Sequence, residues 1–150
     1  MILIAHRGNI NGINEARENS PKYISEALDL GYEVEVDVWR REGEWYLGHD
    51  EPQYLIEELF LLQKGLWCHA KNTSALEVLV ALGVNCFWHQ KDDYTLTSSG
   101  FIWAYPGKKL CVKSICVMPE RYSAETYDFS ECVGICSDNI NYFKELVNEA

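Results

Sequence analysis

Each of the four histidines in the chain stands where a short apolar run ends. They are His6 after ILIA, His49 after WYLG, His69 after LWC and His89 after CFW. Because the carboxyl ends of parallel strands meet on one rim of an α/β fold, we expect the four imidazoles to gather there. Imidazole titrates near neutral pH, so two of them on one rim suit general acid–base catalysis. A single histidine at such a position is more often a hydrogen-bonded core residue.

A run of alternating acids and valines, YEVEVDV, spans residues 32–38. In a strand this alternation puts the valines on one face and the carboxylates, among them Glu35 and Asp37, on the other. Flanking helices would pack on the valine face, so the acids are expected to point inward, where a divalent cation would neutralise them. The residues alone leave a second interpretation open, in which the acidic face of the strand lies in water.

Short apolar runs alternate with helical or loop segments along the chain, and this alternation predicts a single α/β domain. About seven strands, mostly parallel, are expected at residues 2–5, 32–39, 66–70, 85–88, 101–105, 115–118 and 133–136. Helices are expected from Ser20 to Gly31, at 55–63, from Thr73 or Ser74 to Gly83, and at 140–147. A hairpin over residues 41–47 would carry His49 to the rim.

The composition narrows the choice of partners and of compartment. The 150 residues carry 23 acidic and 13 basic side chains, a formal net charge of -10 that repels nucleic acid and anionic membrane surfaces. No run reaches the roughly 18–20 apolar residues of a membrane span, and we expect neither an anchor nor an export signal. Six cysteines without a CxxC pair are expected to be reduced core residues of a cytoplasmic protein.

Four short motifs follow one another along the first third of the chain. They are His6-Arg7-Gly8, Glu18-Asn19-Ser20-Pro21, Glu35-Val36-Asp37-Val38 and Gly48-His49-Asp50. In order and spacing they resemble the signature of the glycerophosphodiester phosphodiesterase family. That resemblance implies a TIM-barrel fold and a catalytic acid–base pair formed by His6 and His49. It also implies that Glu35 and Asp37 bind a divalent metal ion such as Mg²⁺, Ca²⁺ or Mn²⁺.

The chain departs from the family at the ExK motif, where it reads His69-Ala70-Lys71. The resemblance implies that His69 takes the place of a glutamate ligand and that Lys71 faces the phosphate. An imidazole ligand lowers the negative charge of the site and favours a softer ion such as manganese or zinc over calcium. Arg7 and Lys71 are expected to bind the phosphodiester, and their alternative role is a salt bridge to the neighbouring acids without a metal.

The chain is also shorter than the barrels of that family, which have about 250 residues. The resemblance covers about residues 1–72, with a weaker echo at 134–138, GICSD. We therefore expect a shortened TIM-barrel-like (β/α) barrel in which loops replace some crossover helices. Three further site candidates, chosen by position alone, are His89, Asp92 and Glu120. Either of the two acids would be able to supply the carboxylate missing at position 69.

Together these features predict metal-dependent hydrolysis of a small phosphodiester of the glycerophosphodiester type, with acid–base catalysis by two histidines. The alternative is a catalytically inactive module that binds phosphate esters on the same shortened barrel. A metal-free structural protein is a third interpretation, against which the four histidines argue. A missing barrel strand would leave an edge that a second subunit can cover, so dimerisation stays open.

Overall fold

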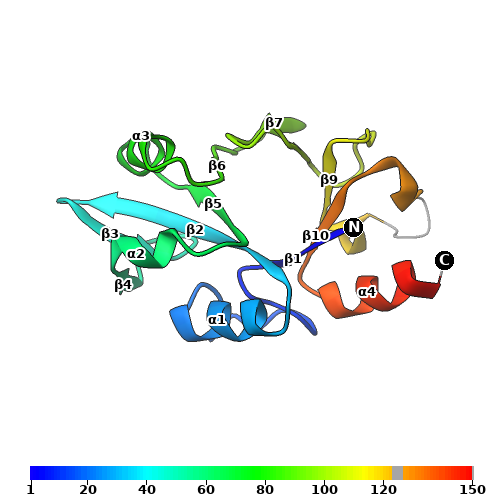
Figure 1. Cartoon of the computed structure of the whole chain (residues 1–150), viewed down its shortest axis with the longest axis horizontal. Coiled ribbons are helices and arrows are strands. Elements are labelled where there is room, and N and C mark those ends of the chain that lie inside the picture. Colours follow the sequence, from blue (N-terminus) through cyan, green and yellow to red (C-terminus); the bar gives the residue numbers. More distant parts are fainter. Residues whose placement is uncertain (123–126, 150) are drawn as a thin grey trace.

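The chain folds into one curled sheet with helices on its outer side (Figure 1). The computed structural model describes residues 1–122 and 127–149, and within them the sheet has ten strands. Hydrogen-bonded neighbours follow the order β4-β3-β2-β1-β10-β9-β8-β7, while β5 pairs with β2 and with β6. The combination of sheet and helices confirms the predicted α/β class.

Seven of the described strands are joined to one another by parallel ladders. In chain order they are β1 (Ile2–His6), β2 (Glu33–Arg41), β5 (Leu66–Ala70), β6 (Cys86–Phe87), β8 (Ile102–Ala104), β9 (Ser114–Val117) and β10 (Gly134–Ser137). Each coincides with one of the apolar runs singled out in the sequence. Because the strands are parallel, their carboxyl ends lie on the same edge of the sheet.

Three further strands in the described part of the chain are antiparallel: β3 (Glu44–Leu47), β4 (Tyr54–Ile56) and β7 (Tyr94–Leu96). The predicted hairpin is confirmed, because β2 and β3 pair on either side of a turn at residues 42–43. The prediction of a helix over residues 55–63 is wrong in its first part. Residues 54–56 instead satisfy the outer backbone groups of β3, and only a short helix, α2 (Glu58–Leu61), follows.

The sheet has an open seam between its edge strands β6 and β7, because β7 pairs with the edge of β8 that faces away from β9. Among the described residues no ladder joins β6 to β7 or to β8, and aromatic side chains of β6 and β8 pack beside this seam. The rings of Phe87 and Trp103 lie 4.7 Å apart between their centroids. The backbone N–H of Ser98 also donates to the carbonyl of Cys86 over 2.8 Å. The sheet is therefore curled and mixed, with a gap where a complete parallel barrel has a ladder.

Three helices, α1 (Pro21–Asp29), α3 (Thr73–Ala81) and α4 (Ile140–Glu149), lie outside the curve of the sheet (Figure 1). Ser20 caps α1 as predicted, since its side chain accepts a hydrogen bond from the backbone N–H of Tyr23, three residues further along the chain. The cap of α3 is Asn72. The prediction of Thr73 or Ser74 as the start of this helix is therefore wrong by one or two residues. Short 3-10 turns lie at Pro119–Arg121 (η1) and Phe129–Glu131 (η3).

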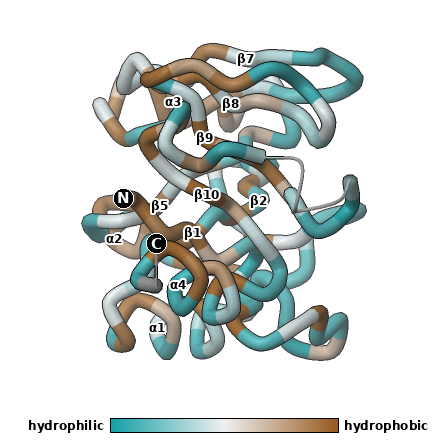
Figure 2. Tube along the Cα trace, turned by 90° about the vertical axis from the view of Figure 1, so that its right-hand side faces the viewer, coloured by the Kyte–Doolittle hydropathy of each residue, from teal (hydrophilic) through white to brown (hydrophobic). Residues whose placement is uncertain are grey.

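Apolar side chains pack in two clusters. The outer cluster joins the valines of β2 to residues of α1, α3 and α4, among them Ile24, Leu79 and Phe143. The inner cluster fills the concave side of the sheet with Ile4, Trp67, Phe87, Trp103 and Ile115. Burying a large apolar side chain contributes about 1.5–3 kcal/mol to stability. Figure 2 shows β1, β9 and β10 as largely hydrophobic, brown segments in the middle of the molecule.

The described helices are all too short or too polar to cross a lipid bilayer. All six cysteines are free, with Cys111 exposed and the other five buried. The prediction of unpaired core cysteines is thus confirmed for five of the six and wrong for the burial of Cys111.

Candidate functional site

One cavity of about 310 Å³ opens at the carboxyl ends of the parallel strands. All four histidines line it, together with Arg7, Glu35 and Lys71. Its remaining lining includes Trp103, Tyr105, Pro106, Val117 and Met118. The predicted gathering of the imidazoles on one rim is therefore confirmed as a matter of position.

Glu35 and Asp37 lie on β2, which has parallel neighbours on both sides. The valines of β2 pack outward against the helices, so the acids point to the concave side, where Glu35 is 2% and Asp37 0% exposed. The interpretation in which these two acids lie in water is therefore wrong. Buried carboxylates are unfavourable without compensation, which their neighbours partly supply.

Asp37 has a dense set of polar partners. Its Oδ2 accepts a hydrogen bond from Asn19 Nδ2 at 2.9 Å and lies 3.1 Å from Arg7 Nε. Its Oδ1 lies 3.2 Å from His69 Nδ1 and 3.6 Å from Lys71 Nζ. Burial by itself would raise the pKa of Asp37, but His69 and Arg7 outweigh burial and hold the pKa far below its usual range. Arg7 and Lys71 thus make the salt bridges that the sequence offered as their alternative role.

The ring of His69 is held in one orientation. Its Nε2 lies 2.9 Å from the backbone carbonyl oxygen of His89, and the ring stacks on Phe87 with centroids 5.1 Å apart. Because a carbonyl oxygen only accepts, Nε2 carries the proton, and Nδ1 faces Asp37 Oδ1 at 3.2 Å and Glu35 Oε1 at 3.6 Å. Burial lowers the pKa of His69, but the two carboxylates outweigh burial and raise the pKa to about 9.

These three side chains have the composition and spacing of a metal-binding group. Glu35, Asp37 and His69 each offer one ligand atom, and the atoms lie within 4.8 Å of one another. Glu35 Oε2 and Asp37 Oδ1 are buried without a hydrogen-bond partner in the described structure. Because the pKa of His69 is about 9, Nδ1 carries a proton at neutral pH, and a metal ion binds there by displacing that proton while Nε2 keeps its bond to the carbonyl, as is common in metal sites. The donor set therefore fits a divalent cation, which would share the acids with Arg7 and Lys71.

Two non-glycine residues with left-handed backbone conformations contact this group, Arg7 (φ 53°) and Asn19 (φ 60°), and a third, Met118 (φ 49°), lines the cavity. Such conformations are unfavourable for L-residues and cluster where function demands a particular geometry. Gly8, the glycine of the HRG motif, has φ 89°, and a Cβ atom there would lie 2.9 Å from the Tyr23 ring. Only glycine fits this turn without strain, and the turn presents Arg7 to the acids.

His6 and His49 each pair Nδ1 with an aspartate, in different surroundings. His6 Nδ1 lies 2.7 Å from Asp138 Oδ1, and their side chains are only 12% and 7% exposed. His49 Nδ1 lies 2.7 Å from Asp50 Oδ1, with the side chains 42% and 92% exposed. Both rings line the cavity, and the second ring nitrogen of His6, Nε2, lies 3.8 Å from Glu35 Oε2.

Asp138 is a candidate that the sequence offered only as part of the weak echo at residues 134–138. β10 pairs with β1 with Ser137 opposite Ala5, so the next residue of each strand, Asp138 and His6, come together. Asp138 also accepts a hydrogen bond from Asn9 Nδ2 at 2.8 Å. Burial by itself would raise the pKa of Asp138, but the hydrogen bond and charge of His6, together with Asn9 and Arg121, outweigh burial and lower the pKa. An acid directly after a parallel strand was the available signal.

The ENSP motif contributes two residues to which the sequence assigned no role. Glu18 Oε1 accepts a hydrogen bond from Asn9 Nδ2 at 2.8 Å, and its Oε2 accepts one from Arg7 Nη1 at 3.2 Å. Asn19 Oδ1 accepts the backbone N–H of Asp37 at 3.0 Å. These contacts depend on the path of the loop before α1, which hydrophobic periodicity does not describe.

The three candidates chosen by position alone have different surroundings. His89 lines the cavity with its Nδ1 3.7 Å from Asp92 Oδ2, while the Asp92 side chain is 56% exposed. Glu120 Oε1 accepts hydrogen bonds from Ser137 Oγ at 2.8 Å and from the backbone N–H of Asp138 at 2.9 Å. In the described residues the metal-binding group includes neither acid. Glu120 instead fixes the turn that carries Asp138.

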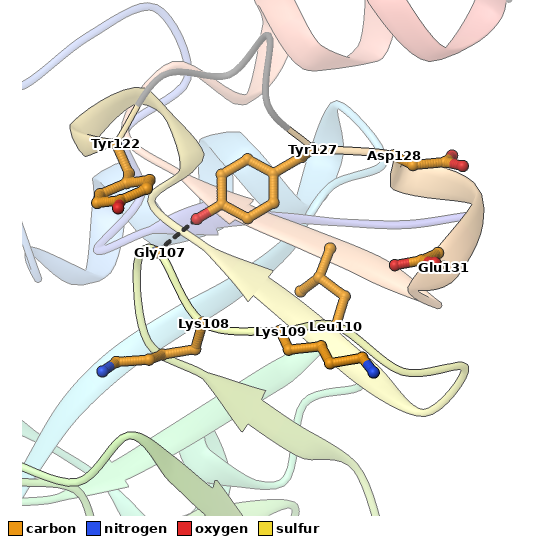
Figure 3. Close-up of a pocket in the computed structure, with 8 residues that line it drawn as sticks. All are labelled: Gly107, Lys108, Lys109, Leu110, Tyr122, Tyr127, Asp128 and Glu131. Atoms are coloured by element: carbon orange, nitrogen blue, oxygen red, sulfur yellow. Dashed lines mark hydrogen bonds between the residues drawn. The ribbon is translucent and has the colours of Figure 1, made fainter.

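A second cavity of about 310 Å³ lies between residues 107–110 and the segment around Tyr127 (Figure 3). The hydroxyl oxygen of Tyr127 accepts a hydrogen bond from the backbone N–H of Gly107. The amines of Lys108 and Lys109 point away from each other, and Lys108 Nζ pairs with Asp93 at 2.9 Å. The described residues that line this cavity include no histidine, so the first cavity is the stronger candidate for chemistry.

Comparisons with known proteins give this chain no relative. A scan against protein-family models, a search of curated proteins and a search of solved structures each find no match.

Proposed function

We propose that this protein is a divalent-metal-dependent phosphodiester hydrolase similar to the glycerophosphodiester phosphodiesterases. The observation that carries the proposal is the convergence of three sequence-distant motifs on one cavity, through His6, Glu35 and His49. The order of the parallel strands supports a shortened (β/α) barrel as its scaffold. From β1 the strands follow chain order through β2 and β5 to β6, and from β8 through β9 and β10 back to β1.

The phosphate end of the substrate would lie against the buried acids and their cations. A divalent ion bound by Glu35, Asp37 and His69 would supply positive charge to the non-bridging phosphate oxygens. Arg7 and Lys71 line the same cavity and would donate hydrogen bonds to these oxygens as charge develops on them. The guanidinium of Arg7 is already oriented by Glu18 and Asp37, at 3.2 and 3.1 Å.

His6 and His49 would exchange protons with the substrate. One imidazole removes the proton of the attacking hydroxyl as the new P–O bond forms, and the other protonates the alkoxide as the old P–O bond breaks. The attacking hydroxyl belongs either to water or to a neighbouring substrate group, which would give a cyclic phosphate. Asp138 and Asp50 hold the Nδ1 atoms, so each ring exchanges its proton through Nε2.

A binding module without turnover is the second candidate, and one observation favours it. Asp37 already pairs with Arg7 and Lys71, at 3.1 and 3.6 Å, and an imidazole stands where the family has a third acid. Such a site holds a phosphate ester by charge alone and does not require an ion.

Release of p-nitrophenolate from bis(p-nitrophenyl) phosphate separates the two candidates. The chain would be treated with a chelator and assayed with Mg²⁺, Ca²⁺ or Mn²⁺, beside His6→Ala and His49→Ala. Ion-dependent turnover that falls by about 10²–10⁴ in both variants, but not in the exposed control Glu145→Gln on α4, supports the hydrolase. Tight binding of phosphate esters without turnover for any ion supports the binding module. If the chain neither hydrolyses nor binds phosphate esters, the hydrolase and the module are both refuted.

A further inference from the structure

The cavity has two walls of different character. The acid wall lies at the carboxyl ends of β1, β2 and β5, where Glu35, His69 and the cations Arg7 and Lys71 line the cavity. Asp37 belongs to this wall through its contacts with them but is itself fully buried. The aromatic wall consists of His89, Trp103 and Tyr105, with Pro106 and Met118, at the ends of β6, β8 and β9. In the sheet, β1 and β10 separate β2 from β9, so Trp103 and Tyr105 lie across the curl from the acids of β2. The two walls adjoin at His89, because β6 pairs with β5 and the rings of His69 and His89 lie 6.2 Å apart.

The rings of the aromatic wall pack against other aromatic rings. Trp103 is 4% exposed, with its ring centroid 4.7 Å from that of Phe87 and 5.7 Å from that of Trp67. Tyr105 is 44% exposed, and its ring centroid lies 5.1 Å from that of His89. The backbone N–H of Tyr105 donates to the backbone carbonyl of Asp93 at 3.0 Å. An accessible ring on fixed neighbours is a ready surface for a flat group, since little side-chain freedom is lost on binding.

The imidazole of His89 belongs to this surface, and among the described residues the acid that it approaches within 4 Å is Asp92, whose Oδ2 lies 3.7 Å from Nδ1. Both of its ring nitrogens are buried without a hydrogen-bond partner in the described residues. Its backbone carbonyl, in contrast, accepts from His69 Nε2 at 2.9 Å. The ring of His89 is thus held by packing against Tyr105, which is the role of a flat aromatic face, while its main chain serves the acid wall.

We propose that the aromatic wall binds one alcohol arm of the phosphodiester and selects an arm that carries a planar aromatic ring. This inference rests on the proposed function for the position of the phosphate, which the acid wall would hold. A cavity of about 310 Å³ is at the small end of the range for ligand sites, so it suits a single ring beside the phosphate. Tyr105 is the specificity-determining residue because it is the accessible ring of the wall.

Calorimetric titration of the whole chain with three simple phosphate monoesters tests this inference without turnover. The ligands are phenyl phosphate, cyclohexyl phosphate, which is apolar but not planar, and methyl phosphate. We expect phenyl phosphate to bind about tenfold more tightly than methyl phosphate, with cyclohexyl phosphate between them. In Tyr105→Ala the preference should fall to about twofold or less, whereas Tyr105→Phe keeps the ring and should keep the preference.

Tyr142→Ala is the matched control, since Tyr142 is an equally exposed tyrosine on α4, away from the cavity. Equal affinities for phenyl and methyl phosphate, a preference that survives Tyr105→Ala, or no binding of any ester would each overturn the inference. If the preference depends on Tyr105 but no phosphodiester is hydrolysed, the hydrolase proposal fails and the aromatic subsite stands. If phosphodiesters are hydrolysed but aromatic esters are not preferred, the hydrolase proposal stands and the aromatic subsite fails.

Discussion

The acid wall and the aromatic wall border the same cavity but are held together by different forces. In the acid wall, Asp37 alone contacts Arg7, Asn19, His69 and Lys71 within 3.6 Å. In the aromatic wall, ring packing positions Trp103 and Tyr105, and the nitrogens of His89 make no hydrogen bond in the described residues. Buried charges tolerate the loss of a partner poorly, whereas packed rings tolerate changes that conserve shape. The two walls should therefore respond differently to substitution.

The largest effect is expected from Asp37→Asn in the acid wall. This change removes the fully buried carboxylate that Arg7, His69 and Lys71 share and should lower the free energy of unfolding by about 3–5 kcal/mol. Urea denaturation measures the loss. The control is Asp93→Asn, because the Asp93–Lys108 pair is largely exposed. The free energy of unfolding of this variant should lie within about 1 kcal/mol of the wild-type value. Equal losses in the two variants would contradict the difference between buried and exposed pairs.

A somewhat smaller effect is expected from Trp103→Ala in the aromatic wall. Removing this buried ring leaves a cavity beside Phe87 and should cost about 3 kcal/mol, while Trp103→Phe should cost less because it keeps a ring at the seam. Thermal and urea unfolding measure both. Binding of Mn²⁺ should stay within twofold of the wild type in Trp103→Phe, roughly the scatter of such measurements, since the ligands lie on the other wall. A joint loss of ion binding would show that the walls are not independent.

The next effect concerns the two histidine–aspartate pairs. The folded-state pKa of Asp138 lies below its unfolded value, so its ionisation stabilises the fold above about pH 4 and this contribution is lost as the pH falls through the folded pKa. Asp138→Asn should therefore reduce stability by about 1.5–3 kcal/mol at neutral pH, and the difference should shrink below pH 4. Urea denaturation over a pH series measures it. A difference that stays constant with pH would contradict an ionised Asp138.

Asp50→Asn sharpens the same comparison at the exposed pair. Because the Asp50 side chain is 92% exposed, its substitution should change the free energy of unfolding by less than about 0.5 kcal/mol at any pH. The same urea series measures this variant. A loss as large as that of Asp138→Asn would mean that burial does not distinguish the two pairs.

The smallest effect is a difference in reactivity between two kinds of cysteine. Burial raises the pKa of Cys116 to about 12 and that of Cys136 well above its usual value, whereas Cys111 is exposed. Since the thiolate is the reactive form, an aromatic disulfide reagent should modify one thiol per native chain and all six after unfolding. Rapid reaction of several thiols in the native state would show that the core opens readily.

Much of the fold could be predicted from local patterns. The seven parallel strands follow apolar runs, and the cap at Ser20 and the hairpin at residues 42–43 follow from residue preferences. Residues 54–56 form a strand because β3 offers free backbone groups, which is a tertiary effect that hydrophobic periodicity does not carry. The open seam between β6 and β7, beside which the rings of Phe87 and Trp103 pack, is likewise a tertiary feature that no local pattern shows.

The candidate site shows the same division. The inward direction of Glu35 and Asp37 follows from the alternation in β2 and from the helices outside the sheet. The pairing of His6 with Asp138 depends on the register of the first and last strands, which are 132 residues apart in the chain. The aromatic wall comes from segments without a recognisable motif, and the sequence offered only His89 among its residues as a site candidate, because of its position after an apolar run.

The most direct test of the proposed site is a crystal structure of the chain soaked with Mn²⁺, with anomalous diffraction recorded at the manganese edge. We predict one strong peak at about 2.0–2.3 Å from carboxylate oxygens of Glu35 and Asp37 and from Nδ1 of His69, with Nε2 of His69 still bound to the carbonyl of His89. A map with no peak there, in which His69 Nδ1 remains paired with Asp37, would contradict a metal-dependent hydrolase.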